Sequence, residues 1–265
     1  MLDFGFYNMD CMEGMKEFPD DYFDLAIVDP PYGAGFTETG GCKGWFSKYH
    51  QDAENPENSR GGEVLEPIRT EVRQIQTHYQ RKNCRKPDGT WGYANWRMGD
   101  NSDKKIITWD VAPGREYFEE LFRVSRNQII WGGNYFDLPP TRCFLIWRKL
   151  SISENFSMAM AEYAWTSFNE NAKVFEYAPQ GRPGDDRFHP TQKPIALYEW
   201  ILNKYAQSGD KILDTHVGSA SSLIACRNTN HQYVGFEIDE MYYNKAKKRI
   251  EKESAQMNIF DFIEN

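Results

Sequence analysis

Hydrophobic and polar positions change period along the chain in a way that predicts alternating strands and helices. Short apolar runs closed by polar or small residues predict buried strands at 25–28, 127–131, 143–147, 211–214 and 233–236, and alternating Ala161, Tyr163 and Trp165 predict one more. Apolar residues three or four positions apart predict helices over 12–18, 116–124, 194–209 and 223–226, and a last one from near Asp239. This alternation predicts an α/β fold with a mostly parallel sheet and helices on both faces.

The composition is that of a chain able to bury one full core. Of its 265 residues 40% are hydrophobic and 15% aromatic, and the net charge is −8, so any contact with nucleic acid must come from a local basic patch. No apolar run reaches membrane-spanning length and the first residues lack the basic start of a signal peptide, so we expect a cytoplasmic protein. Five cysteines without C-x-x-C spacing indicate neither a disulfide framework nor a zinc site, and no metal is expected.

The segment Asp29-Pro30-Pro31-Tyr32-Gly33 directly follows the first buried run. The Asp29 carboxylate and the Pro30 carbonyl can each accept one hydrogen bond from an exocyclic amino group, and the fixed φ of the two prolines would hold both acceptors still. The amine would lose conjugation with its ring and could attack a methyl donor. Tyr32 could stack on a base taken out of a duplex. An ordinary turn is the alternative, but the complete pentapeptide favours chemistry on a base.

A second motif joins the strand at 211–214, a turn of small residues and the start of a helix. Such a turn lets a nucleotide approach the backbone at a helix N-terminus. The next strand ends in Glu237, about twenty residues after the turn, where a carboxylate can accept both ribose hydroxyls. Taken alone, this pattern fits either the dinucleotide of a nicotinamide-dependent oxidoreductase or S-adenosylmethionine.

A third motif, His189-Pro190-Thr191-Gln192-Lys193-Pro194, lies just before that turn. Thr191 can cap the following helix and Pro194 suits its first turn, which is a sufficient structural explanation. Lys193 and the free amides of the helix start could also meet an anion such as the carboxylate of a methionine moiety. The local pattern leaves both explanations open.

In their order along the chain, these three motifs resemble the permuted β class of amino-group DNA methyltransferases. The resemblance implies a circularly permuted Rossmann-like fold in which the strands ending at Asp29 and Asp214 lie side by side, and S-adenosylmethionine as cofactor. It implies Asp29, Pro30, Pro31 and Tyr32 as catalytic residues. The cofactor residues that it implies are Asp10, Thr191, Lys193, Asp214, Gly218, Ser219, Ser221 and Glu237.

Five positions of the turn depart from that family pattern, and Asp10 has a second explanation besides the cofactor. Where the family usually reads D-P-F-x-G-S-G-T-T, this chain has Thr215-His216 for Pro-Phe, Ala220 for the last glycine and two serines for the threonines. His216 therefore puts a titratable ring where the family keeps an apolar one. Asp10 is nearly as well explained as a cap for the helix at 12–18.

The segment 34–105 is much longer than a normal loop between a strand and a helix. We predict a single domain over 1–265 in which this segment is an insertion that contacts double-stranded DNA. Its basic residues are Arg69, Arg73, Arg81, Lys82, Arg85 and Lys86, with only Glu71 opposing them. We expect Arg81, Lys82, Arg85 and Lys86 to meet phosphates, and a solvated helix and linker is the alternative.

Together the motifs predict a site-specific DNA methyltransferase that acts on N6 of adenine, in the setting of restriction and modification. N4 of cytosine is the close alternative because the same acceptors suit either amine, and Asp at the head of the motif favours adenine by the family resemblance. An oxidoreductase or a DNA-binding relic without activity would leave the intact Asp29-to-Tyr32 motif unexplained.

The C-terminal segment carries a further pattern. Gln256, Ile259 and Phe260 resemble the anchoring positions of short Q-x-x-L-F peptides that bind the replication sliding clamp, and docking of this tail onto the protein's own sheet is the alternative. The sequence also leaves a homodimer open.

Overall fold

The computed structural model describes residues 1–32, 84–85, 91–92, 111–153, 159–180 and 187–263, and for 84–85, 91–92 and 256–263 it describes the backbone alone. The chain divides into two units, Met1–Gly33 with Trp109–Asn265, and Ala34–Thr108. The described part of the second unit is a pair of short antiparallel strands, β3 (Cys84–Arg85) and β4 (Trp91–Gly92). All other described elements belong to the first unit.

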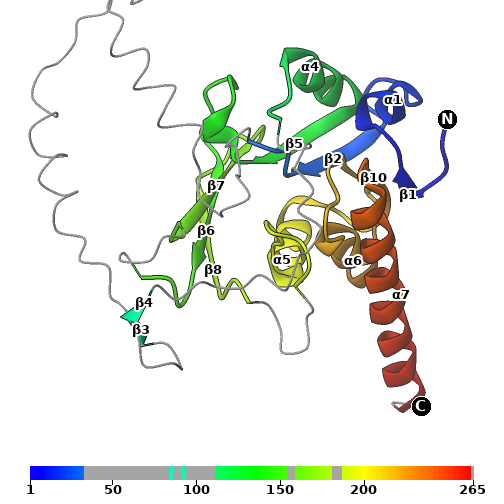
Figure 1. Cartoon of the computed structure of the whole chain (residues 1–265). Helices are drawn as coiled ribbons and strands as arrows, with labels where there is room; N and C mark the ends of the chain where they lie inside the picture. The colour runs from blue at the N-terminus through cyan, green and yellow to red at the C-terminus, as the bar shows by residue number, and fades with distance from the viewer. Residues whose placement is uncertain (33–83, 86–90, 93–110, 154–158, 181–186, 264–265) are drawn as a thin grey trace, which may run out of the picture. The chain divides into compact units, whose positions relative to one another are not determined.

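The first unit is built on an eight-stranded sheet with the order β1-β10-β9-β2-β5-β7-β6-β8 (Figure 1). Its strands are β1 (Gly5–Asn8), β2 (Phe23–Val28), β5 (Ser125–Trp131), β6 (Phe144–Lys149), β7 (Ala161–Thr166), β8 (Lys173–Tyr177), β9 (Lys211–Asp214) and β10 (Gln232–Glu237). β7 runs antiparallel to its neighbours β5 and β6, and every other pair in this sheet is parallel. The predicted mostly parallel sheet is therefore confirmed.

Helices cover both faces of this sheet, as the sequence predicts (Figure 1). One face carries α1 (Cys11–Lys16) and α4 (Arg115–Val124), and the other carries α5 (Ile195–Tyr205), α6 (Ser221–Asn228) and α7 (Glu240–Ile263). A short 3-10 helix, η2 (Gly133–Tyr135), follows β5. None of the helices among the described residues combines the length and the apolar character needed to cross a membrane.

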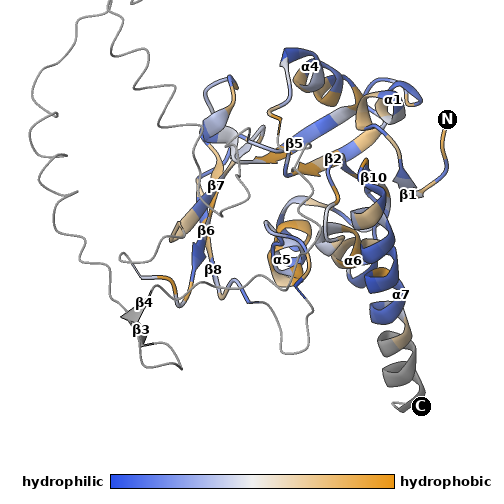
Figure 2. Ribbon diagram, viewed as in Figure 1, coloured by the Kyte–Doolittle hydropathy of each residue, from blue (hydrophilic) through white to orange (hydrophobic). Residues whose placement is uncertain are grey.

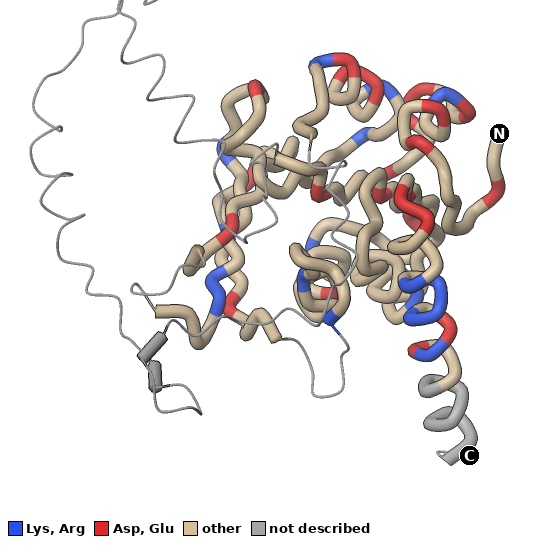
Figure 3. Tube along the Cα trace, viewed as in Figure 1, with Lys and Arg blue, Asp and Glu red and all other residues tan. Residues whose placement is uncertain are grey.

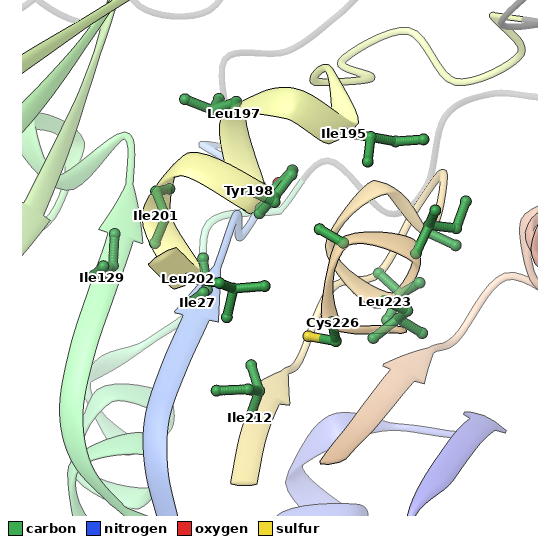
Figure 4. Packing of buried hydrophobic residues seen from close by; sticks show 14 of the residues in the cluster. Ile27, Ile129, Ile195, Leu197, Tyr198, Ile201, Leu202, Ile212, Leu223 and Cys226 are labelled. Carbon is green, nitrogen blue, oxygen red and sulfur yellow. The ribbon is translucent and has the colours of Figure 1, made fainter. Parts of the chain in front are cut away.

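The core follows the period of two along the strands. Leu25 and Ile27 of β2 belong to the cluster that packs under α5 and α6, in which Figure 4 shows Ile27. Ala26 and Val28 belong to the cluster under α1 and α4. β2 and α5 are largely hydrophobic, whereas the coloured N-terminal part of α7 is mostly hydrophilic (Figure 2). Asp29 is the next position on the α5 side after Ile27, so the strand itself directs this residue toward one face.

Two helix starts differ in how well the sequence predicts them. Asp10 is the N-cap of α1, and its Oδ1 accepts a hydrogen bond from the Met12 amide at 2.7 Å, which confirms the capping role. The predicted cap by Thr191 is wrong, because α5 begins at Ile195 with Pro194 as its N-cap and no side-chain cap. The Thr191 hydroxyl instead lies 3.1 Å from Nδ1 of His189.

The strand pairing brings the two motif-bearing turns to one edge of the sheet. β2 pairs in parallel with β9, with Leu25 opposite Ile212 and Ala26 opposite Leu213. The carboxyl ends of parallel strands meet at the same edge, so the segments after Val28 and after Asp214 open there together. The predicted neighbourhood of these two strands is confirmed.

Candidate active site

Asp29 stands at the carboxyl end of β2 with both carboxylate oxygens engaged. Its side chain is 15% exposed. The Tyr32 hydroxyl donates to Oδ1 at 2.7 Å, and the Lys193 ammonium forms an ion pair with Oδ2. Pro30 is buried behind it. A carboxylate oxygen has room for two hydrogen bonds, so Asp29 can still accept one from a substrate.

The ring of Tyr32 is held by aromatic and glycine neighbours. It stacks on Tyr135 with ring centroids 4.8 Å apart and planes at 23°, and Phe136 meets it edge-on at 6.2 Å. The other close neighbour is Gly132, whose φ is +67° and where a Cβ atom would lie 2.1 Å from the Tyr32 ring. Burial, followed by the charge of Asp29, holds the pKa of Tyr32 well above its usual range, so its hydroxyl remains a donor.

Lys193 is buried beside Asp29 and is not open to an anion in solution. Its exposed fraction is 3%, and its ammonium also forms an ion pair with Glu162 Oε2 at 3.1 Å. Burial lowers the pKa of Lys193, but the charges of Asp29 and Glu162 outweigh burial and the pKa is raised. The structure therefore pairs the Lys193 ammonium with Asp29, the candidate catalytic carboxylate. The sequence predicts a different partner, the methionine carboxylate of the cofactor.

The turn after β9 is built around two backbone positions in the left-handed region. Gly218 has a φ of +53° and Ala220 a φ of +65°, which positions the amides that lead into α6. Glu237, at the end of β10, faces this turn: its Oε2 accepts from the Gly218 amide at 2.8 Å and its Oε1 from the Asp239 amide at 2.9 Å. An ionised carboxylate has about four acceptor sites, so Glu237 can still accept a hydrogen bond from a ribose hydroxyl.

The buried side chains of Asp214 and Ser221 stabilise this turn through hydrogen bonds. Asp214 accepts from the His216 amide at 2.9 Å and from the Ser222 hydroxyl, and burial raises the pKa of Asp214 to about 7. The Ser221 hydroxyl donates to the Lys193 carbonyl at 2.7 Å and lies 2.9 Å from Nη1 of Arg249. Ser221 thus ties the cofactor turn to the HPTQKP motif, and Ser219 Oγ lies 3.2 Å from its oxygen.

Two histidines line the same turn as uncharged rings. His189 lies 3.3 Å from where a Cβ atom on Gly218 would stand, and its ring meets Tyr242 edge-on at 4.4 Å. His216 Nδ1 lies 2.9 Å from Thr215 Oγ1, and its ring meets Tyr117 edge-on. Burial lowers the pKa of each histidine to about 4, so His216 behaves as an aromatic neighbour rather than as a charge.

The remaining predicted residues divide into two groups. Pro31 is half-buried just after β2, and Asp10 is exposed two residues after β1, whose Asn8 pairs with Glu237 of β10. Gly33, Arg81, Lys82 and Lys86, with the side chain of Arg85, lie outside the described residues. Within the described part of the chain, His, Cys, Asp and Glu side chains form no group of three able to hold a metal ion.

Glu162 and Lys149 are site residues that sequence reasoning missed. Glu162 is near the start of β7, and its Oε1 lies 2.5 Å from Lys149 Nζ at the end of β6. A usable signal was present, because each is a charged residue at a position of the strand period otherwise filled by core residues such as Trp147 and Ala164.

This geometry joins a carboxylate able to hold an amine to a nucleotide-binding turn on the neighbouring strand. A profile of the N6/N4 methyltransferase family, described as DNA methylase, matches residues 66–248. The chain belongs to this family. The matched segment includes the HPTQKP motif, the 214–222 turn and Glu237, while Asp29 precedes it.

Individual relatives extend this similarity over most of the chain. The type II methyltransferase M.ScaI of Streptomyces caespitosus is 23% identical over 95% of this chain and 82% of its own length. M2.MboI of Moraxella bovis is 24% identical over 93% of this chain and 87% of its own. M.HpaI of Haemophilus parainfluenzae is 40% identical over 76 residues, which are 29% of this chain and 23% of that protein.

The fold also matches a solved structure. The cytosine-N4-specific PvuII DNA methyltransferase aligns with a TM-score of 0.51 and 11% identity, over 97% of this chain and 92% of that protein. The Rossmann-like methyltransferase fold is thereby shown. Family membership also decides between the cofactors that the 214–222 turn left open, in favour of S-adenosylmethionine over a nicotinamide dinucleotide.

Proposed function

We propose that this DNA methylase transfers a methyl group from S-adenosylmethionine to N6 of adenine at a specific site in double-stranded DNA. The observation that carries this proposal is the position of Asp29 and Pro30 at the end of β2, beside β9 and the turn that Glu237 faces. One strand end supplies acceptors for an amine, and its neighbour supplies a cradle for a nucleoside.

The residues of the chain fit a direct transfer to an amino group. The Asp29 carboxylate and the Pro30 carbonyl would each accept one hydrogen bond from the amine, which pulls the nitrogen out of conjugation and frees its lone pair. S-adenosylmethionine, when bound, supplies a methyl group already activated by a positively charged sulfur. Asp29 would then take the one proton that the amine nitrogen must lose on gaining the methyl group, while the cofactor would be released as a neutral thioether.

The cradle has features that suit a nucleoside with free ribose hydroxyls. Gly218 keeps the turn open at a point where His189 would crowd a side chain, and the two Glu237 oxygens accept from the amides of Gly218 and Asp239. Charge-assisted hydrogen bonds are worth about 1.5–3 kcal/mol, so Glu237→Ala should weaken cofactor binding roughly ten- to a hundredfold. Calorimetry that finds unchanged affinity in a folded variant removes Glu237 from the cofactor site.

The choice of adenine over cytosine rests on the Asp-Pro-Pro-Tyr form of the motif. N4 of cytosine is the second candidate because the two acceptors suit either amine. Mass spectrometry of nucleosides from DNA of cells that express the protein decides: N6-methyladenine is the expected product, and N4-methylcytosine, or neither product, contradicts the proposal. Long-read sequencing of the same DNA gives the recognition site.

Further parts of the proposal concern the order of the motifs and the partners. The catalytic motif precedes the cofactor turn along the chain, which supports the permuted arrangement. Arg81, Lys82, Arg85 and Lys86 would contact DNA phosphates, the substrate would place the enzyme in the cytoplasm, and a homodimer remains a proposal.

The tail with Gln256, Ile259 and Phe260 would tether the enzyme to a sliding clamp and so raise its concentration on newly made DNA. The backbone there continues α7 to Ile263, so clamp binding would require the last turns to unwind. A peptide spanning 254–265 should bind purified clamp and should lose binding on Phe260→Ala. A wild-type peptide without affinity at high micromolar concentration contradicts the tether.

A further inference from the structure

Four charged side chains form a continuous row at the carboxyl edge of the sheet. Asp29 pairs with Lys193, Lys193 with Glu162, and Glu162 with Lys149, so that negative and positive charges alternate. The side chain of Lys193 is 2% exposed, that of Lys149 7% and that of Glu162 25%. In the part of the chain that the structure describes, the row links the candidate catalytic carboxylate to a strand outside the sequence motifs.

The topology explains how the row is assembled. β2 and β6 end at this edge, and the antiparallel β7 begins there, so Asp29, Lys149 and Glu162 come from three strand ends that meet. Lys149 continues the period of Leu145 and Trp147, which face α5. Pro194 is the N-cap of α5, and Lys193 just before it reaches between the carboxylates.

Each of the two ammonium groups lies over one aromatic ring. Nζ of Lys193 lies 5.3 Å from the centre of the Trp131 ring, and Nζ of Lys149 lies 5.1 Å from that of Trp147. A charge in such an apolar setting is costly unless it is paired, and removal of one partner leaves the other uncompensated. Each member of the row therefore affects its neighbours.

We propose that Glu162 is a positioning residue for methyl transfer, because it shares the Lys193 ammonium with Asp29 and thereby sets how tightly Asp29 is held. This inference rests on the proposed function at Asp29. With Glu162 in place, Lys193 lies between two carboxylates and fixes Oδ2 of Asp29 while Oδ1 faces Tyr32. Without Glu162, Lys193 moves wholly onto Asp29, which neutralises the acceptor of the target amine, and Lys149 loses its partner.

The pH dependence of the methylation rate reports the charged state of Lys193, and a purely structural role of Glu162 would not change it. Burial lowers the pKa of Lys193 and the two carboxylates raise it, so removal of Glu162 leaves burial opposed by Asp29 alone. The other titratable groups that interact electrostatically with this row come from several elements: Lys149 on β6, Tyr32 after β2, Tyr117 on α4, His189 before α5, Tyr198 on α5 and Asp214 on β9. Loss of Glu162 therefore lowers the pKa of Lys193. Since a neutral Lys193 no longer holds Asp29, the fall in methylation rate at alkaline pH should begin at a lower pH than in wild type.

The test uses the full chain with Glu162→Gln, which keeps the side-chain shape and removes the charge. We expect kcat on a methylatable DNA duplex to fall roughly ten- to a hundredfold, the loss typical of a misplaced reacting group, with cofactor affinity within a few fold of wild type. Glu176→Gln is the matched control, since Glu176 on β8 forms an exposed ion pair with Arg148 at 2.6 Å in the same sheet. It should leave kcat and the pH profile unchanged.

A double variant, Glu162→Gln with Lys149→Met, separates positioning from charge balance. It restores a one-to-one balance between Lys193 and Asp29 and removes the unpaired Lys149, so it should recover stability yet stay slow, with the shifted alkaline limb. Recovery of wild-type kcat in the double variant overturns the inference. Equal kcat and pH profiles in wild type and Glu162→Gln also overturn it. A wild-type enzyme without transfer to any DNA amine overturns the proposed function, and the role of Glu162 with it.

Discussion

At the scale of single residues, two carboxylates of the candidate site have separate contacts. Asp29 contacts Tyr32 and Lys193, whereas Glu237 contacts the amides of Gly218 and Asp239. The two carboxylates therefore serve different ligands, although they stand at the same edge of one sheet. Variants at either one should separate chemistry from cofactor binding.

Asp29→Asn tests the first of these roles. The amide keeps the size of the side chain but carries no charge and is no base, so methyl transfer should fall at least about a hundredfold, the lower range for loss of a general base. Cofactor affinity should stay within a few fold, because the Asp29 carboxylate binds Tyr32 and Lys193, whereas Glu237 binds the amides of the cofactor turn. Equal loss of cofactor binding, measured by calorimetry, would show that the site is misassigned.

Gly132→Ala tests how the ring of Tyr32 is held. A Cβ atom at Gly132 would stand 2.1 Å from that ring, so Tyr32 must move and its hydroxyl leaves Asp29. We expect kcat to fall about tenfold or more while cofactor affinity is kept. Gly209→Ala is the control, because Gly209 also has a left-handed φ of +89° but has nothing within 4 Å of an added Cβ. Matching kcat losses in the two variants would reduce the effect to backbone strain.

At the scale of elements, the sequence predicts most strands and helices but not all of their ends. The HPTQKP helix begins later than Thr191 suggests, because a residue that precedes proline avoids the helical region, and Lys193 precedes Pro194. β8 has no prediction because Lys173–Tyr177 lies at the sheet edge, where alternating half-buried and exposed residues give a weak pattern.

The turn between β9 and α6 gives a prediction on acid stability. Burial lowers the pKa of His216 from 6.5 to about 4, so the unfolded chain binds more protons than the folded one in this range, and stability falls as the pH falls from about 6.5 to 4. Asp214 acts in the opposite direction, since burial raises its pKa to about 7 and stability is lost as the pH rises toward 7. Both groups must be considered together.

His216→Phe isolates the histidine because Asp214 is present in both proteins. The variant should lose less stability than wild type on acidification from pH 7 to pH 4, by up to about 3 kcal/mol, given about 1.4 kcal/mol per unit of pKa shift. Urea unfolding at several pH values measures this difference. Parallel curves of unfolding free energy against pH would show that His216 titrates normally in the folded protein.

The basic cluster Arg81, Lys82, Arg85 and Lys86 gives the second prediction at this scale. Replacement of all four by glutamine should weaken DNA binding and reduce the slope of log affinity against log salt by nearly one unit for each lost phosphate contact. A control with Lys245, Lys247, Lys248 and Lys252 replaced uses the basic stretch of α7, which follows the acidic end of β10 in Figure 3. A salt slope unchanged from wild type would make the cluster an ordinary solvated surface.

At the scale of the whole molecule, strand order decides which motif residues meet. The sequence predicts that β2 and β9 are neighbours, because the family resemblance requires both motifs at one edge. It does not predict the partner of Lys193, because Glu162 belongs to β7, and only the antiparallel insertion of that strand between β5 and β6 brings Glu162 to the edge. The local sequence pattern can predict a strand or a helix, whereas the ion pair between Lys193 and Glu162 depends on the strand order of the complete sheet.

The division of the chain into two units leads to the last prediction. Both core clusters and all eight strands of the large sheet lie in Met1–Gly33 and Trp109–Asn265. Replacement of 34–108 by a flexible Gly/Ser linker of about 15 residues should therefore leave a folded protein that binds S-adenosylmethionine within a few fold of the full chain. The same protein should lose site-specific methylation, because it lacks the basic cluster.

Deletion of the C-terminal tail is the control for deletion of 34–108. Removal of 256–265 shortens α7 beyond the described side chains and should leave both cofactor binding and methylation of short duplexes intact, since the candidate site contacts residues up to Arg249. If the linker variant methylates the same sites as the full chain, the 34–108 segment takes no part in recognition. If it fails to fold while the tail deletion folds, the large sheet needs that segment for stability, and the two units are not independent.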